Sequence, residues 1–101
     1  MLKKNSNKLP IISIITVVLN GEKTLKKCIQ SVINQSYPQN KIEYIVIDGG
    51  SRDRTISIIK KYAKKISYWH SKKDRGLYDA MNKGIKKSSG EIIGILNADD
   101  F

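Results

Sequence analysis

Four short apolar runs, rich in isoleucine and valine, most constrain how this chain can fold. The runs span residues 11–18, 42–47, 66–70 and 92–96. Such runs are typical of strands that are buried on both faces of a parallel sheet. Three segments between them place apolar residues at helical spacing; they cover residues 25–33, 53–65 and 78–87. The order βαβαβαβ predicts an α/β fold with a mostly parallel sheet, flanking helices and right-handed crossovers.

Length and charge bound the organisation of the chain. The 101 residues fit one domain, with residues 1–9 as a basic N-terminal tail and residues 10–101 as the folded part. Lysine and arginine number 19 against 9 aspartate and glutamate residues, so the formal net charge is +10. Such a charge occurs in proteins that bind nucleic acid, an anionic membrane surface or phosphate-bearing small molecules. The lysines are paired and scattered along several expected helices, which favours solvated faces over one nucleic-acid stripe.

The rare residues exclude several kinds of site. A single cysteine, Cys28, cannot form an intramolecular disulfide or a cysteine-based zinc cluster. A single histidine, His70, excludes a histidine-rich metal site. No run approaches the ~18 apolar residues that a membrane span requires. The basic N-terminus and first apolar run lack a signal-peptide cleavage site, so we expect a cytoplasmic chain.

Polar residues come directly after every expected strand, at the edge where parallel strands end. They form four groups along the chain: Asn20 and Glu22, residues 48–54, residues 72–75, and Asn97 with Asp99 and Asp100. In open α/β sheets this edge holds the ligand, because loops and helix N-termini converge there. The four groups therefore predict one ligand-binding site.

The second group begins with Asp48-Gly49-Gly50-Ser51, a carboxylate followed by backbone that a ligand can approach closely. Asp48 is suited to accept hydrogen bonds from a nucleotide base or a ribose. The alternative is a tight strand-to-helix turn capped by Ser51, and either Ser51 or Asp53 is expected to cap the helix that starts near residue 53. Neither G-x-G-x-x-G nor G-x-x-x-x-G-K-[ST] occurs in the chain, which argues against a dinucleotide site and a P-loop.

The last group, Asn97-Ala98-Asp99-Asp100, comes directly after the fourth apolar run. Two carboxylates and an amide within four residues make an oxygen-donor site suited to Mg²⁺ or Mn²⁺. Such an ion bridges diphosphate oxygens and neutralises charge on a leaving group. The alternative is an acidic turn that caps a subsequent helix.

The motifs of residues 11–101 together resemble family 2 glycosyltransferases of the GT-A fold. The matching segments, in family order and with family-like gaps, are Ile12 to Thr16, Asn20-Gly21, Gln30 to Tyr37, Glu43 to Ser51, Asp53-Arg54-Thr55, Gly76 to Gly84 and Gly90 to Asp100. Each segment alone is weakly specific, whereas their succession is strongly so. The resemblance implies a Rossmann-like sheet that forms the N-terminal, nucleotide-sugar-binding half of a GT-A enzyme, truncated after a D-x-D-like segment.

The resemblance also implies roles for individual residues. It places a nucleotide-sugar donor, expected to be UDP-linked, across the strand ends, with Asp48 on the base and Glu22 on the ribose. Asn97-Ala98-Asp99 corresponds to the D-x-D motif, which makes Asp99 and Asp100 the expected ligands of Mg²⁺ or Mn²⁺. The full set of expected nucleotide-sugar-binding residues is Val18, Asn20, Glu22, Asp48, Gly49, Ser51, Lys73, Arg75, Asn82, Asn97 and Ala98.

Two positions depart from the family pattern. Asn97 replaces the usual first aspartate of D-x-D, which weakens the anionic site, and Leu19 replaces an aromatic residue that often stacks on the base. Lys73 and Arg75 lie in a basic loop suited either to the diphosphate or simply to solvent. Asn82 is expected on the third helix near this loop, with structural packing as the alternative to binding.

Members of this family usually invert the anomeric centre in one displacement, with a carboxylate base that takes the acceptor proton. That base lies downstream of D-x-D in the family, so the catalytic residue is expected beyond Phe101. We therefore expect the donor-binding half of a longer enzyme of polysaccharide or glycoconjugate synthesis. Its expected acceptor is a carbohydrate or a lipid-linked molecule, with peripheral association at the inner face of the membrane as an option.

Two other interpretations stay open at this point. One is a non-catalytic basic module that binds nucleotides or nucleic acid, motivated by Tyr68-Trp69 beside Lys72-Lys73, because aromatic rings near cations suit single strands. The resemblance favours the transferase, so nucleic acid is not an expected partner. The other is a chain without a stable fold, in which exposed apolar surface at residues 92–96 promotes self-association.

Overall fold

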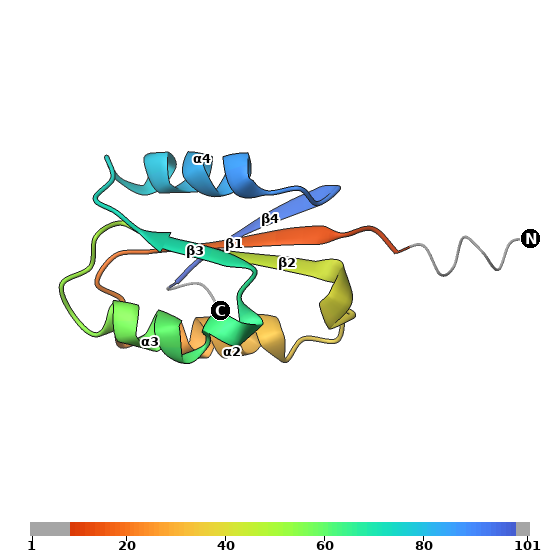
Figure 1. The fold of residues 1–101 in the computed structure, drawn as a ribbon, viewed down its shortest axis with the longest axis horizontal. Helices are drawn as coiled ribbons and strands as arrows, with labels where there is room; N and C mark the ends of the chain where they lie inside the picture. Colours follow the sequence, from red (N-terminus) through yellow and green to blue (C-terminus); the bar gives the residue numbers. More distant parts are fainter. Residues whose placement is uncertain (1–8, 99–101) are drawn as a thin grey trace, which may run out of the picture.

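The computed structural model describes residues 9–98 and shows alternating strands and helices (Figure 1). The strands are β1 (Ile12–Val18), β2 (Ile42–Asp48), β3 (Tyr68–Ser71) and β4 (Ile92–Asn97). The α-helices are α2 (Leu25–Ile33), α3 (Thr55–Lys61) and α4 (Leu77–Lys87), and the 3₁₀ turns are η1 (Gln39–Lys41) and η2 (Ala63–Lys65). Every expected strand and helix is present, and most of the predicted basic tail, residues 1–8, lies outside the described residues.

The four strands form one sheet in the order β3-β2-β1-β4, and each neighbouring pair is parallel. β1 is central, because Ile12 pairs with Ile42 on one side and with Ile92 on the other. Parallel strands need a crossover connection, which a helix supplies between each consecutive pair. This architecture confirms the predicted α/β fold.

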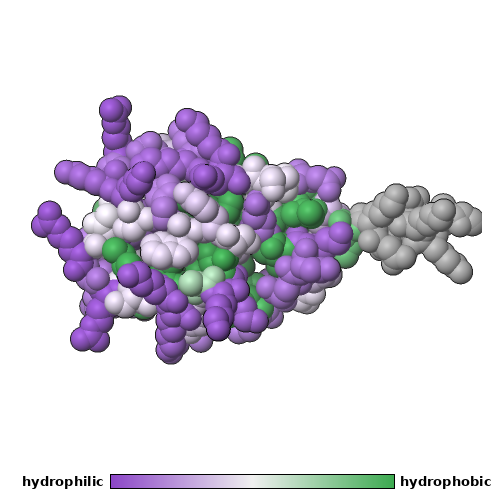
Figure 2. All heavy atoms as spheres, in the orientation of Figure 1, coloured by the Kyte–Doolittle hydropathy of each residue, from purple (hydrophilic) through white to green (hydrophobic). Residues whose placement is uncertain are grey.

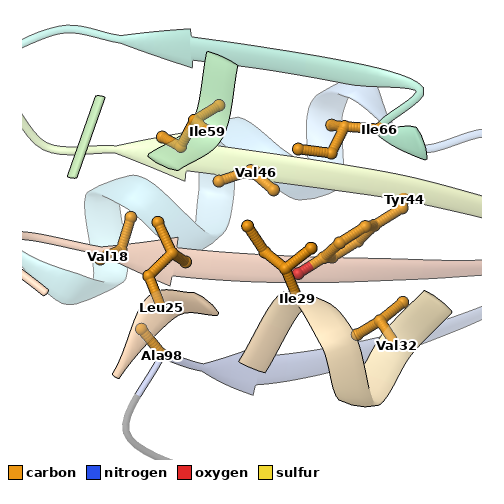
Figure 3. Close-up of a cluster of buried hydrophobic side chains, with 9 residues drawn as sticks. All are labelled: Val18, Leu25, Ile29, Val32, Tyr44, Val46, Ile59, Ile66 and Ala98. Carbon is orange, nitrogen blue, oxygen red and sulfur yellow. The ribbon is translucent and has the colours of Figure 1, made fainter. Parts of the chain in front are cut away.

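Helices cover both faces of the sheet, α2 and α3 on one side and α4 on the other (Figure 1). On the face shown in Figure 2, hydrophilic side chains gather along α4 and along α3. Successive strand residues point to opposite faces, so β1 and β2 contribute to two cores. The core on the α2/α3 side (Figure 3) comprises Val18, Leu25, Ile29, Val32, Tyr44, Val46, Ile59, Ile66 and Ala98. The core on the α4 side comprises Ile15, Val17, Ile45, Ile47 and Ala80.

The end of α3 and the start of β3 differ from the sequence-based prediction. The helix predicted over residues 53–65 ends at Lys61 and continues only as the tighter turn η2. That turn brings Ile66 into the α2/α3 core, where it is 8% exposed. The strand predicted over residues 66–70 therefore begins at Tyr68, where pairing with β2 starts. No helix within residues 9–98 combines the length and the apolar character needed to cross a bilayer.

Candidate functional site

The strand order reverses between β1 and β4. From β1 the chain proceeds to β2 and β3, and α4 then returns it to the other side of β1. Loops beyond the two strands diverge at such a reversal and leave a crevice, which is where open α/β sheets bind ligands. A cavity of about 270 Å³ lies at this point. Its lining residues come from the ends of β1 and β4 and from the start of α4: Val17, Val18, Leu19, Asp74, Gly76, Leu77, Ala80 and Asn97.

Asp48 ends β2, and its side chain is completely buried. Its Oδ2 accepts the N–H groups of Gly50 and Ser51 at 3.0 and 2.8 Å and the Ser71 hydroxyl at 2.6 Å. Its Oδ1 accepts the Ser51 hydroxyl at 2.5 Å. Hydrogen bonds offset the cost of burying a carboxylate. Asp48 therefore fixes the loop after β2 and ties it to the end of β3.

Further hydrogen bonds tie the loop after β1 to the loop after β2. The Asn20 N–H donates to Ser51 Oγ at 2.7 Å, and Asn20 Oδ1 accepts the Arg52 N–H at 2.8 Å. Glu22 Oε1 accepts the Arg54 N–H at 3.2 Å. Asn20 has a φ of 50°, a left-handed conformation that asparagine tolerates and that turns the chain away from β1. Four predicted residues thus form one hydrogen-bonded set, called the loop frame below: Asn20, Glu22, Asp48 and Ser51.

The start of α3 is held by Asp53 and not by Ser51, the predicted alternative. The Ser51 hydroxyl is engaged with Asp48, whereas Asp53 Oδ1 accepts the Thr55 N–H at 2.9 Å. Asp53 Oδ2 accepts the Glu22 N–H at 3.2 Å. Burial raises the pKa of Asp53, but the hydrogen bonds from Thr55 and Glu22 outweigh it and lower that pKa overall. Asp53 thereby stays ionised to a more acidic pH than an ordinary aspartate, and it links the frame to the helix.

The loop between β3 and α4 packs against the two glycines after Asp48. A Cβ atom at Gly49 would lie 2.8 Å from Asp74 Oδ2, so the glycine lets this carboxylate lie against the backbone. Gly50, with a φ of 95°, leaves similar room for Lys73. Asp74 also accepts the Gly76 N–H at 3.0 Å and lines the cavity. Asp74 belongs to the third predicted polar group, residues 72–75, but was not among the residues expected to bind the nucleotide-sugar, although a carboxylate among three basic residues at a strand end is a usable signal.

The predicted residues at the ends of β1 and β4 meet at the crevice. Val18 and Asn97 line the cavity. The Ala98 N–H continues the pairing with β1 at 3.1 Å, and the Ala98 side chain is buried in the α2/α3 core. The predicted metal ligands Asp99 and Asp100 lie outside the described residues.

The predicted residues of the β3–α4 region are more dispersed. Lys73 and Arg75 are exposed in the loop, and Asn82 is exposed further along α4 and is not among the lining residues. Two exposed leucines line the cavity instead, Leu19 at 59% and Leu77 at 48% exposure. Leu19 stands where the resemblance expects an aromatic residue. Leu77 was not predicted, and its exposure as the first residue of a helix has no signal in the sequence.

The polar side chains around the crevice present oxygen atoms: Asp74 supplies a carboxylate and Asn97 an amide. Within residues 9–98, no group of three or more histidine, cysteine or acidic side chains is arranged to hold a metal ion. Oxygen donors suit Mg²⁺ and Mn²⁺ better than soft metals. The oxygen ligands at the crevice therefore fit the expected cation, Mg²⁺ or Mn²⁺. Asp99 and Asp100 are the further ligands that the sequence predicts.

Comparison with protein families identifies the family of this chain. The family model described as glycosyl transferase family 2 matches residues 13–101. The chain belongs to this family. Among curated relatives of this family 2 glycosyltransferase is an uncharacterized glycosyltransferase from Mycobacterium tuberculosis, which is 40% identical over 91 residues. The match covers 90% of this chain and 34% of that relative, so the chain spans about a third of the relative's length.

Solved glycosyltransferases share the fold of this family 2 chain. A mannosyltransferase from Pyrobaculum calidifontis, in complex with GDP-Man and Mn²⁺, has a TM-score of 0.84 and 26% identity. The similarity covers 92% of this chain and 28% of that protein. TarS 1–349 from S. aureus, in complex with UDP-GlcNAc, has a TM-score of 0.78 and 26% identity, over 87% of this chain and 26% of TarS. The predicted GT-A, Rossmann-like architecture is confirmed.

Proposed function

We propose that this chain binds a nucleotide-sugar donor, with UDP as the nucleotide, at the crevice between β1 and β4, as part of a glycosyltransferase. The observation that carries the proposal is the cavity of about 270 Å³ at the reversal of the strand order. The chain belongs to family 2 glycosyltransferases, and two structural neighbours are in complex with GDP-Man and with UDP-GlcNAc. A nucleotide-sugar is therefore the ligand class that best fits this edge of the sheet.

In this proposal the loop frame supports the nucleoside from one side of the crevice. Asp48 is buried and acts by fixing the loop beside the base through its hydrogen bonds from Gly50, Ser51 and Ser71. Glu22 is exposed at the mouth of the frame and contacts the ribose. Gly49 and Ser51 let the backbone approach the nucleotide, and Lys73 and Arg75 supply positive charge to the diphosphate.

The proposed cation is Mg²⁺ or Mn²⁺, held by Asp99 and Asp100 with Asn97 nearby. When bound, the ion neutralises charge on the nucleoside diphosphate as it leaves. Mn²⁺ accompanies GDP-Man in the mannosyltransferase neighbour. The chain's own contribution is to orient the donor: Leu19 and Leu77 cover its apolar parts, and Asp74 keeps the loop against Gly49.

The acceptor and the catalytic base belong, in this proposal, to sequence beyond Phe101. The chain spans about a third of its M. tuberculosis relative, and in this proposal the remaining length of the enzyme supplies the acceptor site. We expect inversion at the anomeric carbon, a carbohydrate or lipid-linked acceptor, and cytoplasmic polysaccharide or glycoconjugate synthesis.

The competing interpretation, a nucleic-acid-binding module, depended on Tyr68 and Trp69 acting together. Tyr68 packs against the α4-side core, and Trp69 packs against the α2/α3-side core. Neighbouring strand residues point to opposite faces, so these two rings do not form one stacking platform. The donor-binding interpretation is the better supported of the two.

Isothermal titration of the chain with UDP and GDP, each with and without Mn²⁺, tests the proposal. We expect UDP to bind more tightly than GDP and Mn²⁺ to strengthen the binding. Leu77→Trp should fill the crevice and weaken UDP binding by about tenfold or more. Ile85→Trp is the matched control, because Ile85 is similarly exposed on α4 but does not line the cavity. Absence of nucleotide binding, or equal effects of the two tryptophans, would refute the proposed site.

A further inference from the structure

The layer formed by α2, α3 and the two 3₁₀ turns is strongly basic, with the acidic residues Glu22 and Asp53 in the loops that enter the two helices. It comprises residues 23–42 and 54–67, which contain nine lysine and arginine residues and no aspartate or glutamate. The nine are Lys23, Lys26, Lys27, Lys41, Arg54, Lys60, Lys61, Lys64 and Lys65. The surface that these residues form is called the basic face below.

The helices direct these side chains away from the sheet. On α2, Cys28 and Ile29 are buried, which leaves Lys26 and Lys27 exposed. The same holds on α3 and η2, and eight of the nine residues are exposed, the exception being half-buried Lys41. In the part of the chain that the structure describes, none of the nine forms a salt bridge with a carboxylate. The basic face therefore presents unneutralised charge to solvent.

The opposite layer has a mixed surface. From residue 74 to residue 91 it carries four basic residues, Arg75, Lys83, Lys86 and Lys87, and three acidic residues, Asp74, Asp79 and Glu91. Lys83 and Asp79 form a salt bridge at 3.4 Å. The net positive charge of the folded part is thus concentrated on one side of the sheet, which a uniformly solvated surface does not require.

A hollow of about 240 Å³ opens on the basic side, between the end of α2 and η2. Apolar side chains, including Val32, Ile33, Ile42 and Ile66, line it together with Lys64 and Lys65. Gln39, Tyr44 and Ser67 complete the lining, so the hollow is of mixed polarity, and a recess of this kind flanked by ammonium groups matches an anionic lipid headgroup with the adjoining part of its chains.

We propose that the basic face docks on an anionic phospholipid surface. Lysine and arginine close to such a surface attract it by electrostatics that act within about one Debye length, and the hollow accepts part of one lipid. The crevice between β1 and β4 lies at the ends of these strands, and Gly76, Leu77 and Ala80 line it from the α4 side of the sheet, whereas the basic face lies on the α2/α3 side. A docked chain would therefore keep its donor crevice open. This inference rests on charge and shape, not on the identity of the donor.

Nucleic acid is the less suitable partner for the same charge. Single strands bind where bases can stack on exposed aromatic rings. Tyr62 and Trp69 are partly buried against the α2/α3 core. Among the aromatic residues that the structure describes, the exposed one is Tyr78, which lies on α4 and is 78% exposed. The basic face offers charge and a recess of mixed polarity without a stacking surface.

The test is flotation of the full chain with phosphatidylcholine vesicles that contain or lack phosphatidylglycerol. We expect binding only to the anionic vesicles, and weaker binding as salt is raised. Lys60→Glu/Lys64→Glu should reduce that binding by about 30-fold or more. Lys86→Glu/Lys87→Glu on α4 is the matched control with the same change of net charge, and it should reduce binding by less than about threefold. Circular dichroism confirms that each variant is folded, and Lys60→Gln/Lys64→Gln replaces the first variant if it is not.

The outcomes separate the possible partners. Equal losses in the two charge-reversed variants would show that only net charge matters and would overturn the proposal. So would absence of vesicle binding, or tight binding of poly(U) that the same α3 substitutions abolish. Inorganic phosphate serves as a competitor, since displacement by phosphate alone would indicate a simple anion site and would also overturn it. UDP titration of the Lys60→Glu/Lys64→Glu variant should match the wild type, so that loss of membrane binding is distinguished from failure of the donor site.

Discussion

β2 and β4 flank β1 on its two sides with the same parallel pairing, yet only β2 is enclosed. Residues 44–48 of β2 are all buried, whereas Ile92, Ile93 and Ile95 of β4 are 49%, 43% and 41% exposed. From the sequences alone, β4 would be expected to be the more buried strand. It reads IIGILN, without a charged residue, whereas β2 reads IEYIVID and contains two. The helices decide the outcome, since residues of α2, α3 and α4 pack against the side chains of β1 and β2 on both faces of the sheet.

This difference gives the two sides of β1 different structural roles. The enclosed side, at the end of β2, is held by the loop frame and leaves little room. The open side, at the end of β4, carries the crevice and the apolar edge. Rigid support and free space therefore lie on opposite sides of β1, a division that substitutions on each side can test.

The most severe test removes the carboxylate at the end of β2. Asp48→Ala leaves four hydrogen-bond donors without their acceptor: the N–H groups of Gly50 and Ser51 and the hydroxyls of Ser51 and Ser71. We expect the free energy of unfolding to fall by about 3–5 kcal/mol. Asp48→Asn, which keeps the shape and one carbonyl oxygen, should lose less. Urea denaturation measures both. A loss below about 1 kcal/mol for the alanine variant would show that the enclosed side does not depend on this group.

A matched pair of truncations compares the two strands directly. Ile47 of β2 is completely buried and Ile95 of β4 is 41% exposed. Ile47→Ala should cost about 3–4 kcal/mol because it leaves a cavity, and Ile95→Ala should cost less than about 1 kcal/mol. Denaturation midpoints with unchanged slopes provide the measurement. Similar losses at the two positions would mean that β4 is covered in solution, as by self-association, and dilution would then restore the difference.

A second pair adds a methyl group instead of removing one. A Cβ atom at Gly84 of α4 would lie 3.2 Å from Ile15 Cδ1 and closer still to Cγ2, whereas one at Gly94 of β4 would meet nothing within 4 Å. Gly84→Ala should destabilise the chain by about 1–2 kcal/mol through overpacking, even though alanine favours a helix. Gly94→Ala should stay within about 0.5 kcal/mol of the wild type. Thermal unfolding monitored by circular dichroism distinguishes the two results.

The smallest effect concerns β3, the other edge strand, which α4 partly covers. Burial, assisted by the charge of Lys83, lowers the pKa of His70, and its Nε2 has no hydrogen-bond partner within residues 9–98. The fold thus favours the neutral ring. Stability is complete above the unfolded-state pKa of about 6.5 and declines as the pH falls below it. Between about pH 7.5 and 5.5 we expect a loss of roughly a few tenths of a kcal/mol, since the group is partly hydrated.

His70→Phe serves as the control for this pH dependence, because it keeps an aromatic ring and removes the titration. The free energy of unfolding of this variant should not change with pH over the same interval. The carboxylates Glu43, Asp53 and Asp79 have lowered pKa values and titrate at more acidic pH. An unchanged slope in the phenylalanine variant would show that β3 is not covered as described.

The sequence was sufficient for the elements and the edge of the sheet that carries the site. Apolar runs and helical spacing are local patterns, so β1, β2, α2 and α4 fall close to their predicted ranges. The shortened α3 and the later start of β3 were not predictable in this way. They result from the need to turn Ile66 into the core, which depends on a helix and a strand that are distant in sequence.

The candidate site shows the same limit. Asp48 and Asn97 were predicted because polar residues come directly after each apolar run and parallel strands end at one edge, whereas Val18 was predicted from the family resemblance. Asp74 and Leu77 were missed as binding residues, because they reach the crevice only through the crossover of α4 to the far side of β1. A motif identifies the residues at the end of a strand, but it does not identify the loop that lies over them.

The sequence by itself determined the alternation of strands and helices and the family, and it predicted an oxygen-rich, thiol-free candidate site. These features depend on residue types at short spacing. The tertiary structure alone decided the strand order β3-β2-β1-β4, the crevice at its reversal and the gathering of nine basic side chains on one layer. These features depend on which helix crosses to which face. Whether a strand is buried depends on the elements that pack against it. Two apolar runs therefore became a buried strand, β2, and an exposed edge strand, β4.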